Sequence, residues 1–211
     1  LYLEAHPTEW MRFFFPNYAK APFAKFHIRA INRIINNPEW YEVLSWSREL
    51  AKSTVIMMTI MYLVLTGQRK MILLSSATED AAKRLLAPYR ANFESNRRIT
   101  QYYGEQRTLG DWEEKCFKTK GGAMFLGIGA GNAPRGLRNE SIRPDVLYQD
   151  DFDTDEVCRN IDVLDKNWDW WEKAVYPTRS ISTPTLVIWA GNIIAEDCCI
   201  VRAGKKANNW D

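Results

Sequence analysis

The sequence predicts an α/β fold with a mainly parallel central sheet flanked by helices on both faces, plus a β-hairpin. Three observations carry this prediction. Short strand-like segments recur along the chain, helical segments follow the first two of them, and residues 71–75 form a continuous apolar run. Alternating strands and helices indicate a parallel sheet, and a continuous apolar run is typical of a strand buried on both faces. The predicted strands are 41–45, 71–75, 145–151 and 185–190.

The bulk composition narrows the class of protein. The 211 residues are enough for one domain with a sizeable core, and the formal net charge of +2 neither supports nor excludes contact with DNA. The four cysteines form no C-x-x-C pair, which favours reduced thiols in an intracellular protein over a zinc site. We expect no membrane span, because the longest apolar run, 55–65, is shorter than the roughly 20 residues that cross a bilayer.

Residues 1–38 are predicted to be a helical lead-in to the sheet. An aromatic-rich segment is followed by a helix over 22–36 that places Lys25, Arg29 and Arg33 in one row at i, i+4 and i+8. A solvated face is the favoured interpretation of this row, and a contact with a nucleic-acid backbone is the alternative.

Residues 47–54 connect the first strand to a helix predicted over 52–65. A strand, a tight polar loop, Lys-Ser and a buried helix are the layout of a phosphate-binding loop. The backbone N–H groups of such a loop and the helix N-terminus make an anion site. In this layout Lys52 reaches the β- and γ-phosphates of a nucleotide, and the Ser53 hydroxyl ligates Mg²⁺.

The phosphate loop lacks both glycines of the G-x-x-x-x-G-K-[ST] pattern. Trp46 and Ala51 stand where those glycines belong, so only Lys52-Ser53 match. The alternative is an ordinary strand-to-helix turn in which Ser47 is the N-cap of the following helix.

The middle of the chain adds a helix over 78–93, capped by Thr78, and a hairpin over 115–129 around a Gly-Gly turn. A glycine-rich segment follows the hairpin and carries arginines. It is interpreted either as a solvated surface loop or as the source of an arginine finger for a neighbouring subunit. Its arginines are Arg135, Arg138 and Arg143.

The predicted strand 145–151 ends in two adjacent carboxylates, Asp150 and Asp151. Neighbouring side chains of a strand point to opposite faces, so one carboxylate can hold Mg²⁺ through water while the other faces an attacking water. That division of work fits a phosphohydrolase. The alternative is a strand followed by an acidic cap, with Thr154 starting a helix.

Two later segments complete the pattern. A helix is predicted over 160–171, and packing is the favoured role of its tryptophans, with base stacking as the alternative. The strand 185–190 ends in Gly191-Asn192. Because the carboxyl ends of parallel strands line the ligand crevice, we expect Gly191 and Asn192 near the γ-phosphate.

Taken in this order, the motifs resemble the ATPase domain of bacteriophage terminase large subunits, the motors that pump DNA into capsids. Residues 47–53 fit that family's Ser/Pro-Arg-x-x-Gly/Ala-Lys-Ser/Thr pattern, in which a missing first glycine is an ordinary variant. The likeness covers roughly residues 23–201. Its other motifs are 23–27 before the loop, 135–151 up to the Walker B acid, and the coupling motif 190–192.

The resemblance implies a role for each matching residue. Lys52 would bind the β- and γ-phosphates, Ser53 and Asp150 would hold Mg²⁺, Asp151 would orient the attacking water, and Arg48 would touch the γ-phosphate. Arg135 or Arg138 would be the trans-acting finger. Gly191 and Asn192 would sense hydrolysis. The nucleotide-contacting loop is Ser47, Arg48, Glu49, Leu50, Ala51, Lys52, Ser53 and Thr54.

Two residues depart from the family pattern. Glu49 stands where the family often has Gly or Gln, so we expect its carboxylate to point to solvent or to Arg48 rather than at a phosphate. Asp151 is one methylene shorter than the usual Glu. These departures bear on turnover more than on nucleotide binding.

The resemblance further implies an ASCE-type P-loop NTPase that hydrolyses ATP with Mg²⁺ to drive double-stranded DNA into a capsid. Residues 39–211 would form its core, with no nuclease domain in this chain. The implied partners are a homo-oligomeric ring on the portal, the small terminase subunit and DNA. The implied location is the host cytoplasm, transiently on the procapsid. The alternatives are a helicase-like motor and a nucleotide-binding scaffold that does not hydrolyse. Every variant of this hypothesis requires Lys52 to meet Asp150 and Asp151 across neighbouring strand ends.

Overall fold

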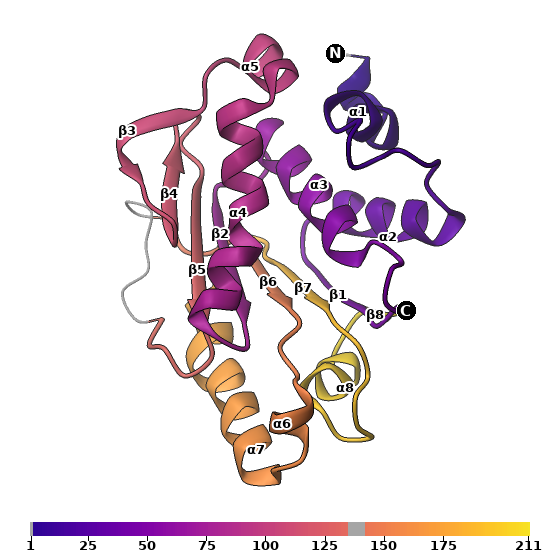
Figure 1. The fold of residues 1–211 in the computed structure, drawn as a ribbon, viewed down its shortest axis with the longest axis vertical. Coiled ribbons are helices and arrows are strands. Elements are labelled where there is room, and N and C mark those ends of the chain that lie inside the picture. Colours follow the sequence, from indigo (N-terminus) through magenta and orange to yellow (C-terminus); the bar gives the residue numbers. More distant parts are fainter. Residues whose placement is uncertain (1, 135–141) are drawn as a thin grey trace.

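The computed structural model describes residues 2–134 and 142–211 and contains one sheet with helices on both faces (Figure 1). Within these residues the strand order is β3-β4-β5-β2-β6-β7-β1-β8. The six strands from β5 to β8 in that order run parallel, and β3 and β4 are antiparallel additions at one edge. The strands are β1 Trp40–Leu44, β2 Met71–Ser76, β3 Arg107–Trp112, β4 Cys116–Thr119, β5 Met124–Gly129, β6 Val146–Asp150, β7 Leu186–Ala190 and β8 Asn209–Trp210.

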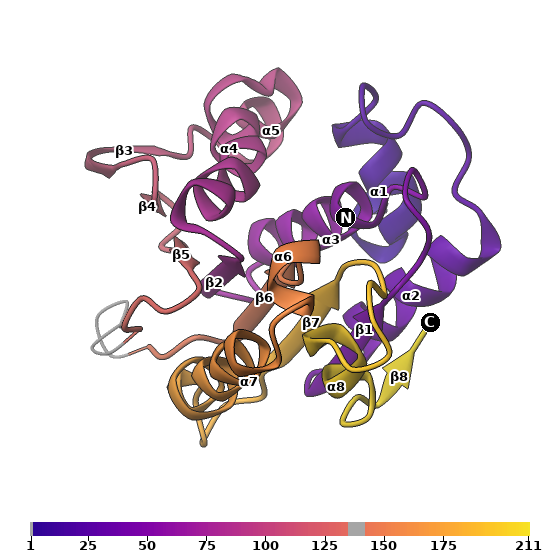
Figure 2. The same ribbon diagram turned by 60° about the horizontal axis from the view of Figure 1, so that its bottom comes forward.

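The helices divide between the two faces of the sheet. Helices α1 to α5 cover one face and α7 and α8 cover the other (Figure 2). Alternate residues of β2 enter different cores, with Ile72 and Leu74 on the α3 side and Leu73 on the α7 side. The helices are α1 Pro7–Phe14, α2 Lys25–Asn36, α3 Lys52–Leu65, α4 Glu79–Ser95, α5 Arg97–Tyr103, α6 Asp155–Cys158, α7 Ile161–Trp170 and α8 Cys199–Gly204.

Helix α3 is apolar on all sides and runs over the predicted range 52–65. Every side chain from Val55 to Val64 is buried, because α3 lies between the sheet and the outer helices α1, α2 and α4. A helix that is apolar all round belongs in such a position. None of the helices formed by the described residues is long and apolar enough to cross a membrane.

Several predicted elements are confirmed with small shifts in their ends. Helix α2 begins at Lys25 rather than 22, and Thr78 caps α4 by accepting a hydrogen bond from Ala81 N (3.1 Å). The hairpin is β4 and β5. The sequence did not predict β3, β8, α5 or α8, which are short or extend an edge of the sheet.

The predicted packing role of the tryptophans is confirmed. Trp168 and Trp171 are buried beneath the sheet, where Trp171 packs edge-on against Trp189 with ring centroids 5.2 Å apart. Trp170 is half-buried, stacks on Phe152 and donates a hydrogen bond to a backbone carbonyl. These rings therefore fix the segment after β6 to α7.

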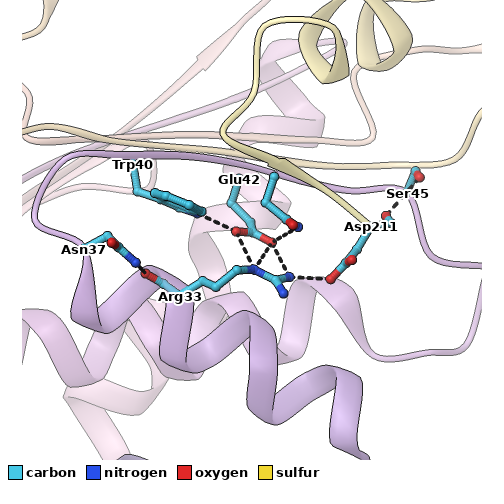
Figure 3. A network of polar contacts seen from close by, with 7 residues as sticks. Arg33, Asn37, Trp40, Glu42, Ser45 and Asp211 are labelled. Atoms are coloured by element: carbon cyan, nitrogen blue, oxygen red, sulfur yellow. Dashed lines mark hydrogen bonds and ion pairs between the residues drawn. The ribbon is translucent and has the colours of Figure 1, made fainter.

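Glu42, in the middle of β1, is the centre of a polar network that lies between α2 and the sheet (Figure 3). Its fully buried carboxylate accepts hydrogen bonds from Arg33 Nη2 (2.6 Å), Trp40 Nε1 (2.6 Å) and Asn209 Nδ2 (3.0 Å). Arg33 also pairs with Asp211, just beyond β8. The network thus fastens α2 to both β1 and β8.

The interpretation of the basic row on α2 was therefore wrong for one of its three members. Lys25 and Arg29 are exposed, as a solvated face requires. Arg33 is half-buried, because the side chain reaches the buried carboxylate of Glu42 instead of solvent.

Candidate active site

The phosphate loop, residues 47–54, leaves β1 and enters α3 through two left-handed residues. Glu49 has φ 68° and Ala51 has φ 57°. This conformation costs an L-residue roughly 1–2 kcal/mol, whereas glycine adopts it freely. Ala51 thus takes up a backbone conformation that favours the glycine of the G-x-x-x-x-G-K-[ST] pattern. Ala51 is also the N-cap of α3, so the alternative in which Ser47 capped this helix is wrong.

Lys52, the first residue of α3, is buried in the mouth of this loop. Its ammonium donates hydrogen bonds to the backbone carbonyls of Trp46 and Ser47 and to Asn192 Oδ1 (3.2 Å). Burial lowers the pKa of Lys52, and the carboxylates of Asp151 and Asp150 act in the opposite direction. One side chain therefore joins the phosphate loop to the segment that follows β7.

His27 holds the same loop from outside. Its Nδ1 accepts a hydrogen bond from Ala24 N (3.1 Å), so its Nε2 carries the proton and donates to the Leu50 carbonyl (2.9 Å). The ring also lies against Trp46, with centroids 5.3 Å apart. Sequence reasoning did not assign a role to His27; the signal was its place in the segment 23–27, which resembles the one before the family's loop.

Asp150, the last residue of β6, is a buried carboxylate with an unpartnered oxygen. The residue is 7% exposed, and none of the described residues donates a hydrogen bond to its Oδ1. Burial raises the pKa of Asp150 to about 6, although the nearby hydroxyls of Ser53 and Tyr148 and the ammonium of Lys52 lower it. A buried carboxylate oxygen without a partner is costly unless a ligand or ion supplies one.

Asp151 directly follows the last residue of β6 and is exposed to solvent. Its left-handed backbone, with φ 43°, turns the chain away from the sheet. Its backbone N–H donates to the Ala190 carbonyl (3.1 Å), which ties the end of β6 to the end of β7.

A cleft of about 570 Å³ brings the loop and one of the two acids together. The residues after β7 form another wall. The lining residues are Arg48, Glu49, Leu50, Ala51, Lys52, Ser53, Thr54, Asp151, Asp153, Thr154, Asp155, Asn192 and Ile194.

Asp150 instead lines a second cleft of about 540 Å³, which Ser53 and Asp151 also line. The two clefts therefore meet at Ser53 and Asp151. The wall of the second cleft includes Tyr89, whose buried hydroxyl has no partner.

The loop and the acids meet, although not across neighbouring strands as expected. Strand β7 lies between β1 and β6. The register places Leu44, Ala190 and Asp150 in one row across the three strands, so their carboxyl ends are level. The residues that follow each strand consequently reach one another across the end of β7.

The oxygen atoms around Ser53 suit a magnesium ion. Mg²⁺ is usually held by one or two carboxylates, substrate phosphates and water rather than by a full set of protein ligands. The unpartnered Oδ1 of Asp150 and the nearby Ser53 hydroxyl can serve as such oxygen ligands. These two residues are the ones that the sequence singled out as metal ligands.

The remaining predicted residues fall in different places. Arg48 and Glu49 are exposed and both line the cleft, so the expected direction of the Glu49 carboxylate, away from a phosphate, stays a prediction. Gly191 is buried, and a Cβ there would lie 3.2 Å from Ile200 Cδ1. The predicted finger residues, Arg135 and Arg138, lie outside the described residues.

The acidic-cap alternative is correct for Thr154 without excluding a site. Thr154 Oγ1 accepts a hydrogen bond from Val157 N (3.2 Å) and caps α6. Asp150 and Asp151 nevertheless line the two clefts, so the cap and the acids coexist.

The chain is similar in structure to two phage large terminases. It matches the large terminase of bacteriophage HK97 with a TM-score of 0.59 and 10% identity, over 96% of this chain and 41% of that one. It also matches the large terminase ATPase domain of Thermus phage P74-26 with a TM-score of 0.53 and 14% identity, over 84% and 68%. The chain has the fold of phage terminase ATPase domains.

This terminase-like fold is shared with a protein solved in complex with ADP. S. cerevisiae Dbp5, solved with Nup159, Gle1, IP6 and ADP, matches with a TM-score of 0.58 and 12% identity, over 98% of this chain and 51% of that one. No protein-family model and no curated protein sequence matches. The chain spans about half or less of the HK97 and Dbp5 chains, and the likeness is one of fold.

Proposed function

We propose that this chain is the ATPase domain of a viral DNA-packaging motor. The observation that carries the proposal is the convergence of Lys52, Asp151 and Asn192 on one cleft, with Asp150 and Ser53 at its edge. The terminase-like fold supports the packaging context. The motor would act as a ring of subunits on the portal, with the small terminase subunit and double-stranded DNA, in the host cytoplasm at the procapsid.

Each residue has a defined task in the proposed reaction. Lys52 exchanges its carbonyl contacts for the β- and γ-phosphate oxygens of ATP, and Arg48 adds a second positive charge from the exposed side of the loop. Bound Mg²⁺ would neutralise phosphate charge, held by Ser53 and Asp150. The exposed carboxylate of Asp151 orients the attacking water and accepts its proton.

Asn192 connects this chemistry to the rest of the chain. Its Oδ1 accepts from the Lys52 ammonium at 3.2 Å when no phosphate competes. When Lys52 turns to the phosphates, Asn192 loses that donor and becomes free to contact the nucleotide. The segment after β7 therefore has a different set of contacts before and after ATP enters.

Phosphate release from ATP with Mg²⁺, measured at several protein concentrations, tests this proposal. We expect Lys52→Ala to abolish turnover, because the ammonium that binds the phosphates is lost. Asp151→Asn is expected to keep nucleotide affinity and lose hydrolysis, since the amide cannot accept the water's proton. Unchanged turnover in Lys52→Ala would remove the site assignment.

A helicase-like motor is the second candidate, because the fold is also that of Dbp5. Strand separation of a nucleic-acid duplex, measured with ATP and Mg²⁺, would favour it over packaging. A chain that binds ATP but releases no phosphate at any concentration would instead be a nucleotide-binding scaffold.

A further inference from the structure

Asp153 lies two residues beyond Asp151 and connects two walls of the cleft. Its carboxylate accepts one backbone hydrogen bond per oxygen, from Cys199 N to Oδ1 (2.9 Å) and from Ile200 N to Oδ2 (2.8 Å). Cys199 and Ile200 are the first two residues of α8. Asp153 also lines the cleft itself.

This contact joins the two chain segments that border the candidate site. The segment from Gly191 to Cys198 leaves β7, carries Asn192 and ends at α8. The segment from Asp151 to Thr154 leaves β6 and enters α6. Asp153 is thus a side-chain connection between the segment that carries the water-orienting carboxylate and the segment that carries Asn192.

The other contacts of the segment after β6 hold it against β7 and α7 rather than against Asn192. Asp151 N donates to the Ala190 carbonyl (3.1 Å), and Phe152 packs on Trp189 with centroids 5.5 Å apart and stacks on Trp170. Among the hydrogen bonds of the described residues, those of Asp153 join this segment to α8, whose N-cap residue, Cys198, makes no side-chain capping bond. Removing the carboxylate would therefore break the hydrogen-bonded link between the two segments, while each keeps its packing against the rest of the fold.

We propose that Asp153 is a positioning residue that sets the placement of Asp151 relative to Asn192. The proposal rests on the ATPase function proposed above. Asp153 acts through its neighbours and takes no part in proton transfer. The two hydrogen bonds are charge-assisted, which makes them stronger than neutral ones and suited to holding the two segments in a fixed relative position.

A second N-terminal cap in this fold provides a matched control. Asn160 Oδ1 accepts hydrogen bonds from Asp162 N (3.1 Å) and Val163 N (3.4 Å), and Asn160 is the N-cap residue directly before α7. It makes the same kind of contact as Asp153 but is not among the residues that line the cleft. Asn160→Ala therefore removes a cap without disturbing the two walls.

The experiment compares wild type, Asp153→Ala and Asn160→Ala in three measurements: thermal unfolding, affinity for a non-hydrolysable ATP analogue with Mg²⁺, and turnover. Both variants are expected to lose stability, Asp153→Ala more than Asn160→Ala because its hydrogen bonds are charge-assisted. Only Asp153→Ala is expected to lose turnover, by about 10²-fold, which is the scale of a displacement near 1 Å at a reacting group. Its affinity for the analogue should stay within about threefold of wild type, because the loop and Lys52 are untouched. Asp153→Asn keeps one acceptor oxygen aimed at α8 and should recover part of the turnover.

Four outcomes would overturn the proposal. Turnover within twofold of wild type in Asp153→Ala removes it, and so does an equal loss in Asn160→Ala, since either result makes Asp153 a helix cap only. A parallel loss of analogue affinity and turnover would place Asp153 in nucleotide binding instead. A wild-type chain that hydrolyses no ATP would remove the proposed function as well, which separates that failure from the first two.

Discussion

Within the described residues, two carboxylates are buried in the sheet, and their surroundings differ. Glu42 in β1 is fully buried, and both of its oxygens accept hydrogen bonds, from Arg33, Trp40 and Asn209. Asp150 in β6 is 7% exposed, and its Oδ1 has no hydrogen-bond partner among the described residues. Burial alone therefore does not distinguish these two acids, whereas unmet hydrogen-bonding capacity does.

The difference follows from where each residue lies along its strand. Glu42 lies in the middle of β1 and faces α2, whose arginine can reach it. Asp150 lies at the carboxyl end of β6, where the chain leaves the sheet and the clefts begin. A partner supplied by the fold stabilises the first, and the second has an oxygen that no described residue pairs.

Removing the fold-supplied partner should have the largest effect on stability. Arg33→Ala leaves the Glu42 carboxylate buried without its cation, and breaking a buried pair in this way costs about 3–5 kcal/mol of unfolding free energy. The shift in urea midpoint at constant m-value measures it. Arg29→Ala, on the same helix but exposed, is the control and should change stability by less than about 0.5 kcal/mol. Equal losses of stability in the two variants would show that Arg33 does not stabilise the buried carboxylate of Glu42.

Asp150→Asn should have a smaller effect of the opposite sign. Burial raises the pKa of Asp150 from 3.8 to about 6 in the folded chain. As pH rises from about 4 to above 6, the unfolded chain loses this proton first, so the unfolding free energy falls by on the order of 2–3 kcal/mol. The neutral amide has no such dependence, and Asp150→Asn should therefore be more stable than wild type at pH 8 and similar to it at pH 4.

Denaturant unfolding of Asp150→Asn at the two pH values measures this difference. Asp111→Asn, on exposed β3, removes a charge without burial and is the control. An Asp150→Asn variant that is less stable than wild type at pH 8 would show that the carboxylate has a stabilising partner after all, and would place Asp150 with Glu42.

The smallest predicted effect on stability comes from backbone conformation, which differs between β1 and the loop that contains Ala51. The residues of β1 around Glu42 are extended, whereas Ala51 is left-handed with φ 57°. Ala51→Gly relieves that strain, and this gain exceeds the entropy cost that glycine adds by making the unfolded chain more flexible. We expect a net increase in the free energy of unfolding of roughly 0.5–1 kcal/mol. Ala87→Gly, at an exposed position inside α4, should lose about 1 kcal/mol. Thermal unfolding of both variants checks the predicted opposite signs.

Local sequence patterns predicted the elements and much of the candidate site. The unbroken apolar run after Lys52 defined α3, and the position of Asp150 and Asp151 at a strand end predicted their place in the clefts. Position along a parallel strand suffices for such inferences, because all the carboxyl ends meet at one edge of the sheet.

Contacts between distant parts of the chain were not predictable in this way. Arg33 has the spacing of a surface residue, and only the pairing of β1 with β8 brings Asn209 and Asp211 beside its carboxylate partner. The bonds of Asp153 to α8 cross 46 and 47 residues of chain. No periodicity in the sequence encodes contacts of that range.

The hydrogen bond from His27 to the Leu50 carbonyl limits how far the chain can be shortened from its N-terminal side. A fragment that begins at β1 would keep every strand of the sheet and the whole of α3. It would nevertheless lose the imidazole that supports the loop from outside, together with the arginine that Glu42 requires. Biochemical work on a minimal fragment should therefore start upstream of Ala24, whose backbone N–H orients that imidazole.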